Sequence, residues 1–165
     1  MKYLWLARHA KSDWGDASLK DFDRPLNDRG LRDAPAMGRW LAKQGVKPDV
    51  MVTSPAKRAL QTAELLADGM GFSKAFVFHE PRIYEAHTGE LQEIIEESDN
   101  GYDHLMLVGH NPAMTQLVND LGGGPLDNLP TCSIAALTYD VTRWIEVETT
   151  LPVKAEVWRP KEVLG

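Results

Sequence analysis

The stretch Leu4-Trp5-Leu6-Ala7-Arg8-His9 passes from four apolar residues to a fixed cation beside a titratable imidazole. An apolar run of this length is typical of a short buried strand. In open α/β sheets, ligands bind at the carboxyl ends of the strands. The stretch therefore predicts a strand over Lys2 to Ala7 that presents Arg8 and His9 to a ligand.

The composition is that of an ordinary globular protein. The chain has 165 residues, of which 43% are hydrophobic and 25% charged, and we expect residues 1–165 to form a single domain. A net charge of −6 argues against a nucleic-acid partner or an anionic membrane surface. Cys132 is the only cysteine, which fits a reducing compartment. The N-terminal apolar run is too short for a signal peptide or a membrane span, so we expect a cytoplasmic protein.

The periodicity of apolar residues predicts strands that alternate with helices over most of the chain. Predicted strands cover residues 2–7, 50–53, 75–78 and 105–108, and predicted helices follow Asn27, Ser54, Thr88 and Pro112. From Cys132 onward the pattern changes to strands at 134–139, 144–149 and 153–158, with no helix between them. This order predicts an α/β fold with a mainly parallel sheet and antiparallel additions.

Polar residues follow each of the first four predicted strands. They are Arg8 and His9 after the first, Ser54 and Arg58 after the second, Glu85 after the third, and His110 after the fourth. In parallel strands these groups would share one rim, joined there by helix N-termini predicted at Ser54-Pro55 and Asn111-Pro112. Two arginines, two histidines and two helix N-termini suit a dianion, and phosphate is the obvious one.

Arg58 also lacks a partner within its own predicted helix. No acidic residue lies three or four positions away, and a cation in the first turn opposes the helix dipole. We therefore expect an anionic partner from elsewhere. A metal site is disfavoured, because no His or Cys pair has the close spacing of common zinc motifs and arginines flank the histidines. No metal and no cofactor are expected.

Four motifs, each after its own strand, resemble the histidine phosphatase superfamily. They are Arg8-His9-Ala10, Pro25-Leu26 with Gly30, the run from Ser54 to Ala63, and Val108-Gly109-His110-Asn111. The short length and the stretch from Pro130 to Ile134 resemble the small phosphohistidine phosphatase (SixA-like) branch. The resemblance extends from Lys2 to about Tyr139. It implies a three-layer α/β/α sandwich of the phosphoglycerate mutase type.

By that resemblance, His9 is the nucleophile and carries the phosphoryl group as phosphohistidine. Its attacking nitrogen must be neutral, so the other ring nitrogen should donate to a backbone carbonyl. Arg8, Arg58 and His110 would bind the phosphoryl oxygens without a metal, with His110 protonated or at least donating a hydrogen bond. The resemblance also implies that Ser12 touches phosphate.

The proton donor is a separate question. Glu85 matches the acid that family members place after the third strand, with Glu80 as the reserve, and a plain surface carboxylate is an equal alternative for Glu85. Ala10 departs from the usual Arg-His-Gly of the family. Lys11, Lys57 and Arg24 are interpreted as solvated cations, and Trp14 and Phe22 could cover the pocket.

The function that these residues favour is a metal-independent phosphatase that removes phosphate from phosphohistidine in proteins. The absence of long insertions between the motifs favours an open site, since little chain is left to form a lid. One alternative is a phosphatase of small phosphomonoesters, and another is a non-catalytic phosphate-binding module. Mutase activity is less favoured, because it needs a closed pocket. The expected partner is a phosphorylated protein or a small phosphorylated substrate.

Overall fold

Six strands form one mixed sheet in the computed structural model, which describes residues 1–165. They are β1 (Lys2–Arg8), β2 (Val50–Thr53), β3 (Val77–His79), β4 (His104–Gly109), β5 (Ile134–Tyr139) and β6 (Lys154–Trp158), in the order β3-β2-β4-β1-β5-β6. Strands β1 to β4 are mutually parallel, whereas β5 and β6 are antiparallel additions. The predicted mainly parallel sheet is therefore confirmed.

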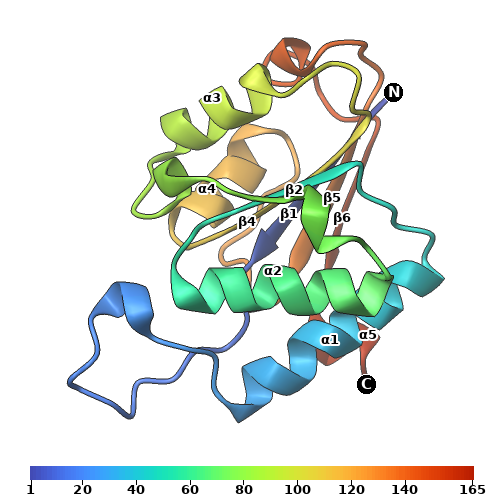
Figure 1. Ribbon diagram of the computed structural model, residues 1–165. Helices are drawn as coiled ribbons and strands as arrows, with labels where there is room; N and C mark the ends of the chain where they lie inside the picture. Colours follow the sequence, from blue (N-terminus) through green and yellow to red (C-terminus); the bar gives the residue numbers. More distant parts are fainter.

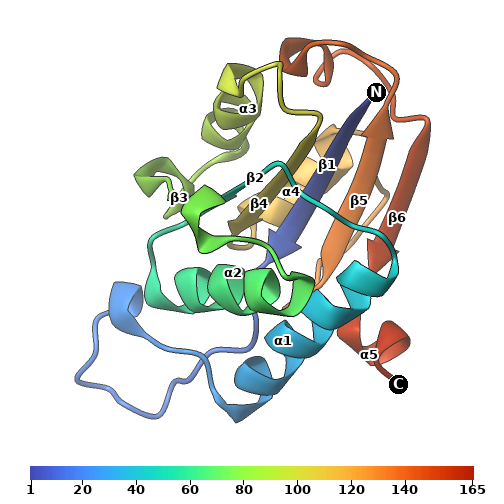
Figure 2. The same ribbon diagram turned by 45° about the vertical axis from the view of Figure 1, so that its right-hand side comes forward.

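Helices cover both faces of the sheet (Figures 1 and 2). Helices α1 (Asp28–Lys43), α2 (Lys57–Met70) and α5 (Pro160–Val163) lie on one face, and α3 (Thr88–Glu97) and α4 (Ala113–Asp120) on the other. Side chains alternate along β1, because successive residues of a strand point to opposite faces. Leu4 and Leu6 enter one hydrophobic core, and Trp5 and Ala7 enter the other. The three-layer α/β/α sandwich is confirmed.

Strand β4 lies at the centre of the parallel part of the sheet. It pairs with β1 on one side and β2 on the other. In this register Gly109 lies opposite Arg8, and Val108 lies opposite Thr53. The three carboxyl ends are therefore level, and residues that follow β1, β2 and β4 meet at one rim.

Helix α1 begins as its sequence predicts. Asn27 is the N-cap, and its side-chain oxygen accepts a hydrogen bond from the Gly30 N–H at 2.9 Å. The cap of α3 differs from the prediction by one residue, because His87 rather than Thr88 precedes the first turn. There the Glu90 carboxylate accepts from the His87 N–H at 2.9 Å. No helix is both long and apolar enough to cross a membrane.

Helices α1 and α2 touch backbone to backbone at Gly38 and Gly69. A Cβ atom added to Gly38 would lie 2.5 Å from the Leu66 carbonyl oxygen and 2.9 Å from the Gly69 Cα. One added to Gly69 would lie 2.6 Å from the Pro35 carbonyl oxygen. Only glycine at both positions permits this close approach of α1 to the C-terminal part of α2.

We expect Gly38→Ala to lower the free energy of unfolding by about 1–3 kcal/mol, because the added methyl group pushes α1 and α2 apart. Helix propensity alone would favour alanine by up to about 1 kcal/mol. Gly89→Ala in α3 is the matched control, since a Cβ there meets nothing within 4 Å. Urea denaturation measures both variants. Equal stability changes for the two would contradict the close packing at Gly38.

The stretch 144–149 is not a strand, so this part of the prediction is wrong. It begins with the 3₁₀ helix η4 (Trp144–Glu146) and continues in turns. The physical reason is the Trp144 side chain, which is fully buried and donates from Nε1 to the Tyr102 carbonyl oxygen at 2.9 Å. The buried residues of this stretch, Trp144 and Val147, are three positions apart, which is the spacing of a 3₁₀ turn and not of a pleated strand.

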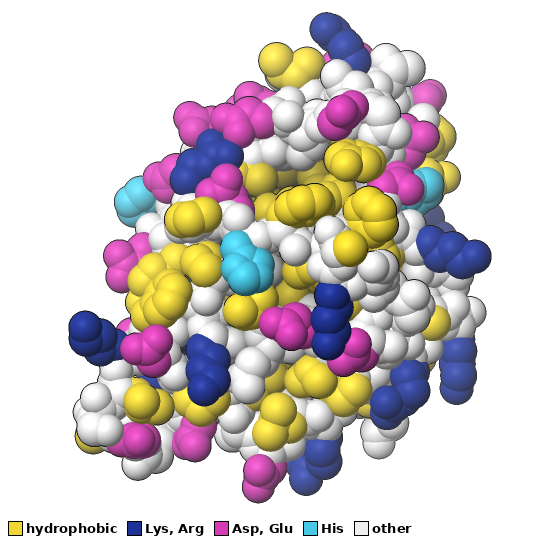
Figure 3. Space-filling view, in the orientation of Figure 1, with side chains coloured by type: hydrophobic (Ala, Val, Ile, Leu, Met, Phe, Trp, Pro, Cys, Tyr) yellow, Lys and Arg dark blue, Asp and Glu magenta, His cyan; other side chains and the backbone are white.

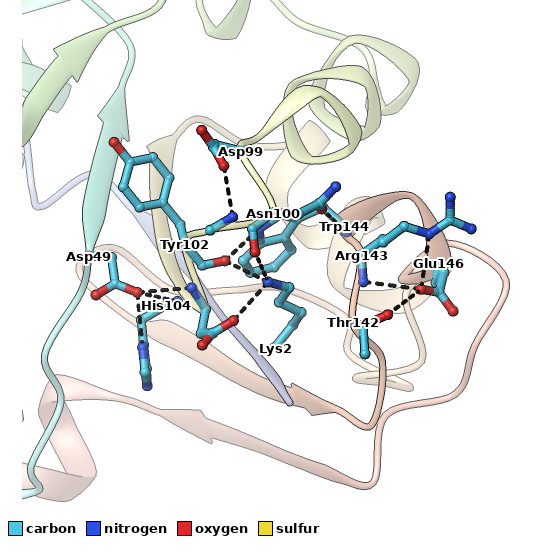
Figure 4. A network of polar contacts seen from close by, with 12 residues as sticks. Lys2, Asp49, Asp99, Asn100, Tyr102, His104, Thr142, Arg143, Trp144 and Glu146 are labelled. Carbon is cyan, nitrogen blue, oxygen red and sulfur yellow. Dashed lines mark hydrogen bonds and ion pairs between the residues drawn. The ribbon is translucent and has the colours of Figure 1, made fainter.

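Lys2 closes the end of the sheet opposite to Arg8 (Figure 4). Its buried ammonium donates to the carbonyl oxygens of Asn100 and Tyr102 and to Asp103 Oδ1, at 2.7 to 2.8 Å. The same ammonium lies 5.4 Å from the centroid of the Trp144 ring. Each of the three ammonium protons therefore has an acceptor, which offsets the cost of burying the charge. This network fixes the start of β1.

The β3 edge of the sheet is partly open. Figure 3 shows hydrophobic side chains gathered in a hollow over this region, between α3 and α2. The groove there has a volume of about 270 Å³, and its apolar lining is Val50, Val52, Phe78, Ile94 and Tyr102. Strand β3 has only three residues, and such a short edge limits pairing with another chain.

Candidate active site

His9 lies directly after β1 and is only 7% exposed. Its Nδ1 is 2.7 Å from the Ala10 carbonyl oxygen. A carbonyl only accepts hydrogen bonds, so Nδ1 carries the proton and Nε2 keeps its lone pair. Ala10 is therefore the backbone partner that the sequence left unidentified.

The electrostatic surroundings keep His9 neutral. Burial is the main cause that lowers its pKa, and the charges of Arg58, Arg8 and Arg24 act in the same direction. The hydrogen bond to Ala10 opposes them, and the resulting pKa is about 4. At neutral pH the imidazole is therefore unprotonated at Nε2, which is the form that can attack phosphorus.

His110 follows β4, and its ring centroid lies 5.2 Å from that of His9. Its Nε2 is 2.8 Å from Ser54 Oγ, which accepts from the Ala56 N–H at 3.2 Å. Ser54 is fully buried and its hydroxyl proton has no other acceptor, so that proton is directed to Nε2, and the imidazole proton lies on Nδ1. Burial, His9 and Arg58 lower the pKa of His110 to about 3. Of the two forms expected for His110, the structure favours the neutral donor over the protonated one.

Two arginines approach the same point. Arg8 donates from Nη1 to the Leu129 carbonyl oxygen at 3.1 Å, and Arg58 donates from Nη1 and Nη2 to Asp21. The Nε atoms of both arginines and Nδ1 of His110 are buried and have no hydrogen-bond partner. Buried donors without a partner are rare in proteins. Three of them in residues that surround His9 call for an acceptor with several oxygen atoms.

Helix α2 does not begin at Ser54-Pro55, so this part of the prediction is wrong. It begins at Lys57, and its N-cap, Ala56, makes no side-chain cap. The Ser54 hydroxyl instead bonds the Ala56 N–H and the His110 ring. Ser54 therefore orients a histidine, and Arg58 is the second residue of the helix.

The prediction of a solvated Arg24 is wrong. It is 7% exposed and donates from Nη1 to Ser12 Oγ at 3.0 Å and to the Asp13 carbonyl oxygen at 3.2 Å. Its guanidinium lies 3.4 Å from the centroid of the Trp14 ring, which is itself 73% exposed. Ser12 therefore contacts a cation of the site, and its own contact with phosphate stays a prediction. Lys11 and Lys57 are exposed, as expected.

Asp21 and Tyr84 belong to the site, and sequence reasoning did not find them. Asp21, in the 3₁₀ helix η1 (Asp21–Asp23), is the expected anionic partner of Arg58. The Tyr84 hydroxyl donates to Asp21 Oδ2 at 2.8 Å. Partial burial alone would raise the pKa of Asp21, but hydrogen bonds from Tyr84, Arg58 and Arg24 lower it to about 2. The only sequence signal was the unpaired Arg58, which indicates that a partner exists but not where.

The two candidate acids differ in their surroundings. Glu85 is exposed, makes no hydrogen bond within the chain and has a positive φ of 59°. Such a backbone conformation is strained for a residue other than glycine, and strained residues cluster at functional sites. Glu80 is paired with Arg82 at 2.8 Å, and hydrogen bonds from Arg82 lower its pKa. Glu80 is therefore the poorer proton donor, and the role of Glu85 stays a prediction.

The exposed apolar residues beside the site lie on the segment between β1 and α1. Phe22 packs edge-on against Tyr84, with ring centroids 5.1 Å apart. Trp14, Leu19 and Phe22 are all exposed. No group of three or more His, Cys, Asp or Glu side chains is placed to hold a metal ion.

Comparison with known families identifies the protein at the level of its superfamily. The profile of the histidine phosphatase superfamily (branch 1) matches residues 4–103. This chain belongs to the histidine phosphatase superfamily. An uncharacterised chloroplast protein of Arabidopsis thaliana is 34% identical over 151 residues, which are 87% of this chain and 69% of that protein. The same fold therefore occurs in relatives whose activity is not described.

Two further similarities relate this histidine phosphatase to named proteins. A structure provisionally assigned as phosphohistidine phosphatase SixA from Nakamurella multipartitia has a TM-score of 0.82 and 25% identity, and 96% of each chain is covered. A 2,3-bisphosphoglycerate-dependent phosphoglycerate mutase from Nocardia farcinica is 35% identical over 91 residues, which are 54% of this chain but 37% of the mutase. The predicted phosphoglycerate mutase-like, SixA-like fold is confirmed over nearly the whole chain.

Proposed function

We propose that this histidine phosphatase hydrolyses phosphorylated substrates through a phosphohistidine formed on His9, without a metal ion. The observation that carries the proposal is a neutral His9 Nε2 surrounded by residues with three unpaired donors. These are the Nε atoms of Arg8 and Arg58 and Nδ1 of His110. Such a set can bind the equatorial oxygens of a phosphoryl group in transfer.

In the first step, Nε2 of His9 attacks phosphorus, and the bond from phosphorus to the leaving group breaks. The phosphorylated imidazole carries a positive charge, which the Ala10 carbonyl stabilises by accepting from Nδ1–H. In the second step, water attacks the phosphorus and breaks the P–N bond. Inorganic phosphate leaves, and the neutral imidazole is restored.

The substrate that we favour is phosphohistidine in a protein. Trp14, Leu19 and Phe22 are exposed on the segment that also carries Asp21, the partner of Arg58. Exposed apolar side chains beside a site are typical of surfaces that another protein covers. The similarity to a structure provisionally assigned as a phosphohistidine phosphatase supports the same choice.

Rapid-quench labelling with a protein or peptide that carries radioactive phosphohistidine tests this function. The expected product is an acid-labile, base-stable phosphate on the enzyme, followed by release of inorganic phosphate. Phosphate binding with neither label nor turnover would instead support a phosphate-binding module. A label together with a much higher kcat/KM for p-nitrophenyl phosphate would support a phosphatase of small phosphomonoesters.

Glu85→Gln is expected to slow an alkyl phosphate by about 10²-fold, because an alkoxide leaving group needs a proton. Phosphohistidine should be slowed less than about threefold, since its leaving nitrogen can already be protonated. Steady-state kinetics on both substrates measures the ratio. Glu162→Gln, in α5, is the matched surface control. Equal slowing of both substrates by Glu85→Gln would count against its role as the acid.

A further inference from the structure

The guanidinium of Arg58 is bound along one edge only. Its Nη1 donates to the Asp21 carbonyl oxygen at 2.7 Å, and its Nη2 donates to Asp21 Oδ2 at 3.0 Å. Its Nε is buried and has no partner. A guanidinium is a rigid planar fork, so holding the Nη1–Nη2 edge also fixes the direction of the Nε–Nη2 edge.

Asp21 is itself held by two further groups, one from a distant part of the chain and one from its own segment. Tyr84, in the connection between β3 and α3, donates to Oδ2 at 2.8 Å. Arg24 lies 3.2 Å from Oδ1, and Ser12 and Trp14 fix Arg24 in turn. The carboxylate therefore has a defined place between its three donors although its side chain is half exposed.

We propose that Asp21 is a positioning residue for Arg58, which turns the free Nε–Nη2 edge of the guanidinium toward phosphate. The inference rests on the proposed function, in which Arg58 binds the phosphoryl group. Arginine recognises a phosphate best through two parallel N–H bonds, and this bidentate geometry depends on the orientation of the fork. Asp21 supplies that orientation from outside the phosphate position.

The opposite role for Asp21 makes the opposite prediction. A carboxylate that competed with phosphate for Arg58 would have to leave when phosphate binds. Its removal would then tighten phosphate binding, whereas removal of a positioning residue weakens it. The sign of the change therefore separates the two roles.

Calorimetric titration with inorganic phosphate tests the proposal without any turnover. We expect Asp21→Asn to weaken phosphate binding about tenfold, within the usual range of coupling between contacting residues. Asp23→Asn is the matched control, since it removes the same charge two residues away in the same 3₁₀ helix and Asp23 makes no ion pair. Its binding constant should stay within about twofold of wild type.

The decisive comparison is made in the Arg58→Ala background. A residue that acts only through Arg58 has nothing to position there, so adding Asp21→Asn should change phosphate binding less than about twofold. Equal weakening in both backgrounds, tighter binding in Asp21→Asn, or unchanged binding in the single variant would overturn the proposal. Wild-type protein that binds phosphate but is never labelled would contradict the hydrolysis alone, because the binding constants remain readable.

Discussion

His9→Ala is expected to abolish both turnover and phosphate labelling, with a loss of at least about 10⁴-fold in kcat. No other side chain in the site offers a free imidazole nitrogen with its second nitrogen held by a backbone carbonyl. Rapid-quench labelling and steady-state hydrolysis of a phosphohistidine substrate measure the loss. Residual binding of phosphate should persist, because Arg8, Arg58 and His110 remain.

The fold of this variant should be retained. His9 contributes one side-chain hydrogen bond, so its removal should cost on the order of 1–2 kcal/mol of unfolding free energy. Urea denaturation checks this cost. His79→Ala is the matched control, since His79 is exposed and makes no side-chain hydrogen bond. Near wild-type activity in His9→Ala would contradict the covalent mechanism.

Arg58→Ala is expected to lower kcat/KM by about 10³-fold, because a buried cation that stabilises the transferring phosphoryl group is lost. Arg58→Lys should lower it by about 10²-fold, since an ammonium keeps the charge but lacks the planar fork. Steady-state kinetics with the phosphohistidine substrate measures both ratios.

Lys57→Ala is the control for Arg58, because Lys57 is its exposed neighbour in the first turn of α2. Removal of this charge should change kcat/KM less than about threefold, since solvent screens it. Full activity in Arg58→Lys would show that only the charge matters. That result would remove the reason for a guanidinium at this position.

The sequence predicts the convergence of His9, Arg58 and His110, because it depends on the regular geometry of parallel strands. Each residue follows its own apolar run, and the register of β1, β2 and β4 brings the ends of the runs level. Local patterns specify each strand, and the parallel order of the strands brings their carboxyl ends to one rim. This part of the site is therefore readable without a structure.

The partners of these residues are not readable in the same way. Asp21 lies 37 residues from Arg58 and 63 from Tyr84, and no local pattern connects them. Arg24 is polar and lies in a polar stretch, so its burial depends on Ser12 and on the Trp14 ring. Contacts of this kind are set by tertiary structure, which a propensity argument does not contain.

The errors in secondary structure have the same origin. Serine is a common helix N-cap, but the Ser54 hydroxyl is hydrogen-bonded to the His110 ring, and α2 begins three residues after it, at Lys57. The stretch 144–149 has the apolar alternation of a strand, but Trp144 is buried in a 3₁₀ helix and bonded to Tyr102, and Val147 is buried three residues later. In both cases a side chain found a distant partner that outweighed the local preference.

Because β4 lies between β1 and β2, the parallel part of the sheet cannot form from the N-terminal part of the chain alone. Strand β4 is the last parallel strand in the chain, yet it joins β1 to β2. A fragment that ended at Asp103 would leave those two strands without their common neighbour and would lack His110. The site is therefore complete only when all of the parallel strands are present. The connections outside the sheet, such as the segment that carries Asp21, can change without breaking these strand pairings.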